Sequence, residues 1–248
     1  MISDRQKQLM IAIIKEFMSS ASAIGSEELK QLYNFDLSPA TIRNELADLV
    51  KEGYLYKEHS SAGRIPTTLA WRYYVSEVLR DEQINPLSET QIRDKVFQYR
   101  FSLDRLVKEA TDAIADLTDY TGVGIVESSI ASTKIAPVYL SGTSNLLLYK
   151  EFHHLELLKK ILTVLENSTI LLKIFTKANS NNEINILIGE EIGLPSLKDI
   201  STIFIVIPLG RTEKIYIGAI GPSRMNYSKV ISSVRAIGNS IHDATVGW

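Results

Sequence analysis

Residues 38–51 carry side chains suited to contacts with the edges of DNA bases, and they lie in an expected helix. The amide of Asn44 can form two hydrogen bonds with an adenine edge, the hydroxyl of Thr41 can bond several bases, and the methyl group of Ala40 can touch that of thymine. In a helix-turn-helix, the second helix enters the major groove with its N-terminal residues nearest the bases. We therefore expect Ser38, Ala40, Thr41 and Asn44 to read a DNA sequence.

Cationic side chains in and after this helix are candidates for contacts with phosphates. They are Arg43, Lys51, Lys57 and Arg64. Such contacts add affinity that depends on salt concentration but not on base sequence. The net charge of this region gives no support for DNA binding, because residues 1–75 contain nine Lys and Arg against nine Asp and Glu. An alternative stays open, in which Ser38 only caps a helix and Arg43 only pairs with an acidic neighbour on the surface.

Three helices are expected to position these residues. The first begins at a capping box formed by Ser3 and Gln6, and a short second helix covers about residues 26–33. Ser38 caps the third, with Pro39 at the first helical position, where a missing N–H costs nothing. The buried stripe of the third helix should comprise Ile42, Leu46, Leu49 and Val50.

A short ribbon is expected after the third helix. Residues 54–58 alternate in polarity and predict a strand, residues 59–63 predict a tight loop, and residues 64–66 return, with Pro66 acceptable on an edge strand. Three helices followed by such a ribbon are typical of a winged helix-turn-helix. An aromatic helix and a polar linker at residues 81–88 come next.

The remaining sequence predicts a second domain of mixed α/β type, so the whole chain is expected to be α+β. Helices are expected at Phe152–Glu166 and Tyr227–Ile241, while residues 170–175 fit either a strand or a helical turn. Short apolar runs predict strands at residues 122–126, 134–140, 145–149, 184–188, 202–208 and 214–220. We expect a winged-helix DNA-binding domain at residues 1–80, a linker and helix start at 81–102, and a regulatory or dimerisation domain at 103–248.

A helix expected from Leu103 to Tyr120 has apolar residues at spacings of three and four, the pattern of a coiled-coil seam. It spans only about two and a half heptads, so the face can pack on its own domain or on a second chain. The candidates for dimerisation are Leu103, Leu106, Ala110, Ala113 and Leu117.

No constellation of catalytic or metal-binding residues is recognisable. The adjacent His153 and His154 point about 100° apart on a helix and could not easily share a metal ion, and nucleotide-binding and nucleophile-elbow motifs are missing. The chain has no cysteine, which excludes disulfides and iron–sulfur clusters. We expect no enzyme activity, no cofactor and no bound metal. Without a leader or a long apolar run, a soluble, cytoplasmic protein that does not bind membranes is expected.

Four separated blocks resemble the HrcA family of bacterial heat-inducible transcription repressors. They are "SPATIRNELADLVKEGYLYKEHSSAGRIPTTLAWRYYV", "LSGTSNLLLYKEF", "IGEEIGLPSLKDIST" and "IGPSRMNYSKVISSV". The resemblance implies a winged-helix domain followed by a GAF-like domain, and a homodimer that represses chaperone operons at an inverted-repeat operator. It places Thr41, Arg43 and Asn44 on the recognition helix and Ser60, Ser61, Gly63 and Arg64 on the wing. It also implies the GroEL chaperonin as a partner that keeps the repressor active.

The chain departs from the family pattern in one respect. Family members usually carry a dimerisation domain inserted before the "GTSNLL" block, but here residues 132–134 run into that block almost at once. The helix face from Leu103 to Tyr120 then becomes a candidate for dimerisation. Two rival functions stay open: a small-molecule sensor, whose pocket could be lined by Tyr120, Gly122 and Gly124, and an interaction protein that no longer represses.

Overall fold

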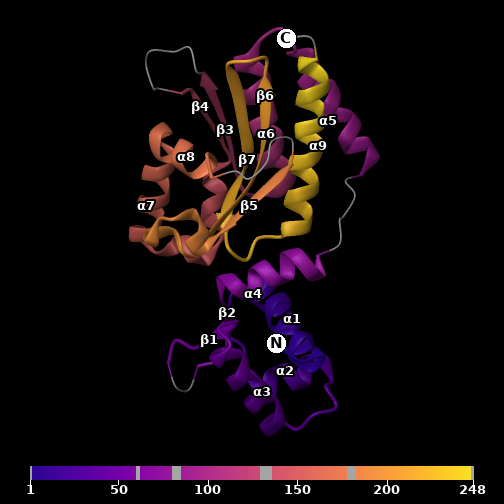
Figure 1. The fold of residues 1–248 in the computed structure, drawn as a ribbon, viewed down its shortest axis with the longest axis vertical. Helices are drawn as coiled ribbons and strands as arrows, with labels where there is room; N and C mark the ends of the chain where they lie inside the picture. Colours follow the sequence, from indigo (N-terminus) through magenta and orange to yellow (C-terminus); the bar gives the residue numbers. More distant parts are fainter. Residues whose placement is uncertain (1, 60–61, 80–84, 129–135, 178–182, 247–248) are drawn as a thin grey trace. The chain divides into compact units, whose positions relative to one another are not determined.

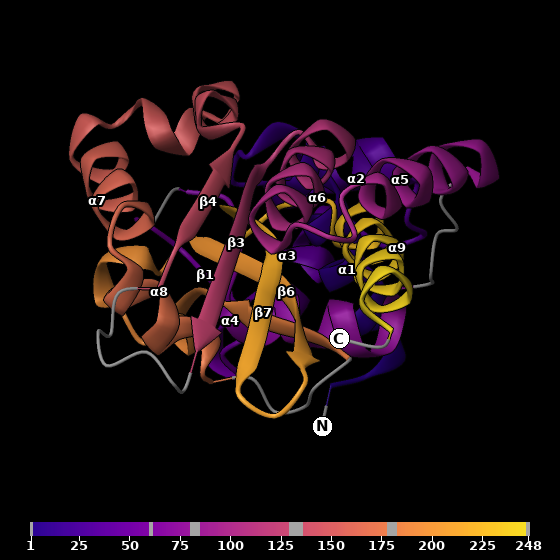
Figure 2. The same ribbon diagram turned by 90° about the horizontal axis from the view of Figure 1, so that it is seen from above.

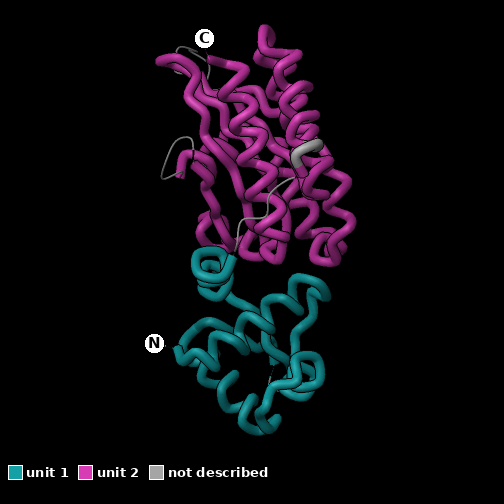
Figure 3. The backbone as a smooth tube through the Cα atoms, turned by 90° about the vertical axis from the view of Figure 1, so that its right-hand side faces the viewer, with its two compact units in different colours: residues 1–79 teal, residues 80–248 magenta. Residues whose placement is uncertain are grey.

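The computed structural model describes residues 2–59, 62–79, 85–128, 136–177 and 183–246. The chain forms two compact units, Met1–Leu79 and Arg80–Trp248, shown in different colours in Figure 3. The second unit begins before α5 (Pro86–Gln98), which packs against two other helices of that unit. Residues 86–98 lie in the segment that was expected to be a linker and helix start, and they form a helix that packs in the second unit. The polar composition of the segment gave no sign of this packing.

The first unit contains three helices, a two-stranded ribbon and a fourth helix. Its elements are α1 (Asp4–Ser20), α2 (Ser26–Tyr33), α3 (Pro39–Lys51), β1 (Leu55–Tyr56), β2 (Ile65–Pro66), α4 (Thr68–Tyr73) and the π-helical turn η1 (Tyr74–Val78) (Figure 1). The two strands are antiparallel, with Leu55 opposite Pro66. The capping box of Ser3 and Gln6 is present at the start of α1. This order of elements is that of the expected winged helix-turn-helix.

The second unit is built on a five-stranded antiparallel sheet with the strand order β4-β3-β7-β6-β5. The strands are β3 (Thr121–Ser128), β4 (Val138–Ser141), β5 (Ile184–Ile188), β6 (Ile200–Leu209) and β7 (Glu213–Pro222). The longer helices are α5, α6 (Leu103–Thr118), α7 (Leu155–Leu165), α8 (Ser168–Phe175) and α9 (Tyr227–Thr245). Short 3₁₀ turns η2 to η5 cover Thr143–Leu148, Lys150–His153, Gly189–Ile192 and Pro195–Leu197.

Helices cover both faces of this sheet. The helices α6 and α9 pack against the strands and, with α5, lie side by side in Figure 2. The opposite face packs on α7 and α8, because Val123 and Ile125 of β3 share a core with Ile161 of α7 and Phe175 of α8. Successive residues of a strand face opposite sides, so Gly122 and Gly124 lie on the α6 side.

Two apolar runs are too short for their sequences alone to determine whether they form a strand or a helix. Residues 145–149, expected to be a strand, belong mostly to the 3₁₀ turn η2, in which the amides of Asn145 and Tyr149 bond to carbonyl groups three residues earlier. Only Leu146 of its three leucines is buried. Residues 170–175 lie in α8, which Asn167 caps by accepting a hydrogen bond from the amide of Ile170.

Candidate nucleic-acid interface

The helix α3 is oriented by an apolar stripe on one side. Ile42, Leu46 and Leu49 are fully buried in the first unit. The opposite side is exposed and carries Ala40, Arg43, Asn44, Asp48 and Lys51. Because an α-helix has 3.6 residues per turn, burial of the apolar stripe leaves the opposite side of α3 exposed. Arg43, Asn44 and Lys51, which were expected to meet DNA, are thus on the outer face of the helix, whereas Thr41 is half-buried.

Ser38 and Thr41 are occupied with the start of α3. The Ser38 hydroxyl accepts a hydrogen bond from the amide of Thr41 at 3.1 Å and lies 2.8 Å from the Thr41 hydroxyl. A serine at this position satisfies a backbone N–H that has no partner inside the helix. Ser38 therefore caps α3, whether or not it also contacts DNA. Because its hydroxyl bonds Ser38, Thr41 offers less to a base than the sequence suggested.

An ion pair links α1 to the flank of α3. Arg5 donates to the carboxylate of Glu45, whose side chain is only 12% exposed. This link was missed by sequence reasoning, because its two residues are 40 positions apart and each resembles an ordinary surface charge. Arg43 forms no ion pair with a described residue, whereas Lys51 binds Asp48 one turn earlier at 3.0 Å. A phosphate contact by Lys51 would have to compete with Asp48.

A short backbone pairing that the sequence did not reveal joins the wing to the segment before α2. The amide of Arg64 donates to the carbonyl of Ile24 at 2.8 Å, and the amide of Ile24 donates back at 3.2 Å. Gly63 lies directly on this segment, since a Cβ there would come within 2.5 Å of the backbone of Ala23 and Ile24. Gly63 is therefore required for close packing of the wing.

The side chains of the wing differ in how accessible they are. Arg64, expected to contact DNA from the wing, is only 7% exposed, and its backbone pairs with Ile24. Burial lowers the pKa of its guanidinium, and the charge of Arg43 lowers it further. Lys57 is exposed. Ser60 and Ser61 lie outside the described residues.

The described residues give no sign of a metal site or of a membrane-spanning helix. In these parts of the chain, no three His, Asp or Glu side chains are grouped so that they could hold a metal ion. None of the described helices is both long enough and apolar enough to cross a bilayer.

Comparison with known proteins decides the family. A sequence model of the HrcA protein C-terminal domain matches residues 88–231, which is more than half of the chain. The chain belongs to the HrcA family.

Relatives of the HrcA family match over nearly the whole chain. The heat-inducible transcription repressor HrcA of Symbiobacterium thermophilum is 26% identical over 336 aligned positions, which cover 98% of each protein. That of Ruminiclostridium cellulolyticum is 25% identical over 337 positions, covering 98% of this chain and 97% of the relative. A crystal structure of a protein described as hypothetical superposes with a TM-score of 0.76 at 17% identity, over 99% of both chains. The predicted fold, a winged helix followed by a GAF-like domain, is confirmed.

The alignments also confirm that this chain is a compact member of the HrcA family. The first one runs over 336 positions, whereas the chain has 248 residues. The difference of 88 is the least number of positions at which the relative has a residue and this chain has none. That these positions form one segment, absent before the "GTSNLL" block, stays a prediction.

The dimerisation face expected on α6 is already used inside this HrcA chain. Leu106 and Ala110 are both 0% exposed, and α6 packs on β3, β4, β7 and α9. The remaining candidates, Leu103, Ala113 and Leu117, are half-buried. The seam prediction is therefore wrong for Leu106 and Ala110, because heptad spacing also arises when a helix packs on its own sheet.

Neighbouring groups occupy the space beside the residues that were proposed to line a sensor pocket. A Cβ at Gly122 would come within 2.4 Å of the Thr111 carbonyl oxygen, and one at Gly124 within 2.6 Å of the Thr111 hydroxyl. These two glycines let α6 approach the sheet. Tyr120 is buried and stacks on Tyr149 with ring centroids 5.1 Å apart.

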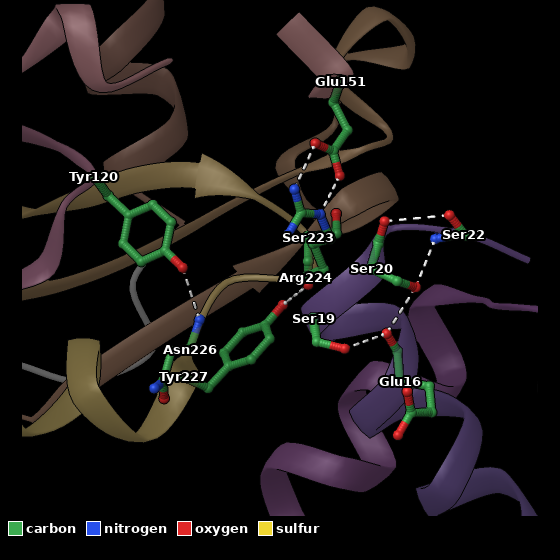
Figure 4. A network of polar contacts seen from close by, with 10 residues as sticks. All are labelled: Glu16, Ser19, Ser20, Ser22, Tyr120, Glu151, Ser223, Arg224, Asn226 and Tyr227. Carbon is green, nitrogen blue, oxygen red and sulfur yellow. Dashed lines mark hydrogen bonds and ion pairs between the residues drawn. The ribbon is translucent and has the colours of Figure 1, made fainter. Parts of the chain in front are cut away.

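Two of the sequence blocks that resemble HrcA meet at an ion pair in the second unit. Arg224 binds both carboxylate oxygens of Glu151, at 2.5 and 3.1 Å, and lies over the ring of Tyr149. Figure 4 shows this pair, with the Tyr120 hydroxyl directed at the amide of Asn226, from which it accepts a hydrogen bond at 3.0 Å. These contacts join segments up to 106 residues apart and give both blocks a structural role.

Proposed function

We propose that this chain represses chaperone operons by binding an inverted-repeat operator as a pair of chains. The observation that carries the proposal is the exposed face of α3, where Ala40, Arg43 and Asn44 stand free of the apolar stripe that anchors the helix. The names of the relatives, heat-inducible transcription repressors, support the same reading.

Each part of the interface has a defined task in this proposal. Asn44 bonds a base edge, Ala40 packs against a thymine methyl group, and Arg43 bonds a phosphate or a guanine. The cap at Ser38 and the ion pair of Arg5 with Glu45 hold the helix rigid, so that less conformational freedom is lost on binding.

The pair of chains follows from the symmetry of the operator. Two half-sites related by a two-fold axis present the same surface twice, so two copies of α3 can bind them equally well. The resemblance to HrcA also supports the GroEL chaperonin as the partner that maintains the active repressor, and occupation of GroEL by heat-unfolded proteins would release the operon.

Binding of the full chain to a labelled inverted-repeat fragment, against a scrambled fragment of equal length, tests the proposal. We expect two chains per operator and a clear preference for the intact repeat. Asn44→Ala should reduce this preference by about 1–3 kcal/mol, the usual value of one two-bond base contact. Lys15→Ala, a change of an exposed side chain on α1, is the control. Equal binding of both fragments by the unaltered chain would refute the proposal.

A further inference from the structure

Two phenylalanine side chains at the end of α5 are exposed to solvent. Phe97 is 46% exposed, and Phe101, at 83%, is the most exposed large apolar side chain among the described residues. The guanidinium of Arg100 lies over both rings, 4.3 Å from the centroid of Phe97 and 4.4 Å from that of Phe101. These three side chains form one surface, the aromatic patch.

The backbone holds the aromatic patch in a defined shape. After α5 ends, the amide of Arg100 donates to the carbonyl of Phe97 at 3.2 Å. The amide of Ser102 donates to the carbonyl of Tyr99 at 2.8 Å, which closes the turn into α6. Phe101 therefore belongs to an ordered turn and is not part of a frayed helix end. Exposed aromatic side chains beside an arginine have the composition that is enriched in protein interfaces.

The outer face of α5 also carries charges of both signs. Ile92 and Val96 are buried on its inner face, where α5 packs on α6 and α9. Figures 1 and 2 show α5 as the outermost of these three helices. At 100° per residue, Arg93, Asp94 and Phe97 lie on the side away from this packing. Arg93 and Asp94 are exposed, and neither forms an ion pair with a described residue.

This outer face is complementary to itself. When two identical helices pair antiparallel about a two-fold axis, each position meets the one equally far on the other side of the axis. With the axis at Phe97, Asp94 lies opposite Arg100 of the second copy. Arg93 then lies opposite the ring of Phe101 of the second copy. Each pairing forms twice, one as an ion pair and the other as a cation beside an aromatic ring.

We propose that two copies of this chain associate through the outer face of α5 and the aromatic patch. The inference rests on the proposed function, which requires two chains for each operator, and names the surface that joins them. The α6 face cannot do so, because its central residues are buried inside each chain. One pair of helices is small beside a standard interface of about 1,600 Å², so we expect a dimer that dissociates on dilution. Two chains held on one operator would associate more completely.

Sedimentation equilibrium of the full chain without DNA, over a wide range of concentration, tests this surface. The unaltered chain should pass from monomer to dimer as its concentration rises. Phe101→Ser should weaken association by at least about tenfold, because a large apolar side chain is lost on both sides of the axis. Its melting temperature should not change, since Phe101 is 83% exposed. Leu155→Ser, at a position 79% exposed on α7, is the matched control and should leave association unchanged.

A charge exchange tests the pairing of Asp94 with Arg100. Asp94→Arg and Arg100→Glu each place like charges opposite one another twice in a symmetric pair, so each variant alone should be monomeric where the unaltered chain is dimeric. An equal mixture of the two variants should dimerise. In the mixed pair the two substituted side chains attract each other, and the second contact keeps its original charges. A charge that acts only within its own chain could not be rescued by mixing.

Three results would overturn the inference. The unaltered chain could remain monomeric at every concentration, in which case the aromatic patch binds something other than a second copy. Phe101→Ser could associate as strongly as the Leu155→Ser control. The two charge variants could also fail to associate when mixed.

A failure of the proposed function is distinguishable from a failure of this inference, because sedimentation is measured without DNA. A chain that dimerises through Phe101 but binds no operator would refute the proposed function and support the dimer surface. Operator binding by Phe101→Ser at the same affinity and with the same stoichiometry as the unaltered chain would support the function and overturn the inference.

Discussion

The hydroxyl groups of Ser38 and Thr41 lie 2.8 Å apart at the start of α3, where Ser38 also accepts the amide proton of Thr41. A hydroxyl group that is hydrogen-bonded at the start of a helix is less available to bond a base. In the proposed operator complex we therefore expect Asn44 and Ala40, one turn or less away on the exposed face, to contact the bases in place of Thr41.

Removal of the cap should affect stability more than sequence preference. Ser38→Ala leaves the Thr41 amide without its partner and should lower the free energy of unfolding of the first unit by about 1 kcal/mol. Thr41→Val keeps the amide bond to Ser38 and should cost less. Denaturant titrations followed by circular dichroism measure both. A Thr41→Val chain that loses as much operator preference as Asn44→Ala would show that Thr41 reads a base after all.

The wing should not tolerate a side chain at Gly63. A methyl group there would overlap the backbone of Ala23 and Ile24, so Gly63→Ala should cost about 1–3 kcal/mol of stability and weaken DNA binding by displacing the wing. Gly25→Ala is the matched control, since nothing lies within 4 Å of its would-be Cβ and its φ is −91°. Equal melting temperatures and equal affinities for the two variants would contradict this account of the wing.

The buried face of α6 should matter for folding and not for association. Leu106→Ala leaves a cavity in the core of the second unit and should cost about 2–5 kcal/mol. Leu155→Ala, at a position 79% exposed, should leave stability unchanged. Sedimentation of the folded chains should give the same oligomeric state for both variants. A folded Leu106→Ala chain that dissociates into monomers would restore α6 as a dimer seam.

Sequence patterns were most successful where structure is local. The cap at Ser38, the buried stripe through Ile42 and the ribbon after α3 depend on residues near one another in the chain. The burial of Arg64 depends on Ile24, 40 residues earlier, and nothing in "GRIP" signals that pairing. The same limit applies to Glu45, whose partner is on another helix. The heptad spacing on α6 was real, but spacing alone does not identify the partner surface.

Alkaline pH should destabilise the second unit through the half-buried Tyr139 and the buried Tyr216. Burial, and then the neighbouring Asp104 and Glu127, raise the pKa values of Tyr139 and Tyr216 above the ordinary value. The folded state therefore holds these protons after the unfolded chain has lost them. Their stabilisation is complete below about pH 10, the pKa of an unperturbed tyrosine, and is lost progressively above it.

Denaturant titrations between pH 8 and 11.5 measure this loss. The unaltered chain should lose stability above about pH 10. In Tyr216→Phe, which cannot ionise at this position, the decline should be shallower. Identical declines would show that Tyr216 does not contribute to the alkaline transition. The hydroxyl of Tyr216 donates to Glu127 at 2.7 Å, so the variant also removes one hydrogen bond, and only the pH dependence isolates the ionisation.

Transcription in vitro from a chaperone-operon promoter tests the central claim most directly. Purified chain is added to polymerase and template, with a second template whose inverted repeat is scrambled and with the Asn44→Ala chain alongside. We predict that the unaltered chain suppresses transcripts only from the intact template, and that the variant requires about tenfold more protein, as expected for the loss of one base contact. Transcript levels that do not change with the unaltered chain on either template would contradict the assignment as an operator-specific repressor.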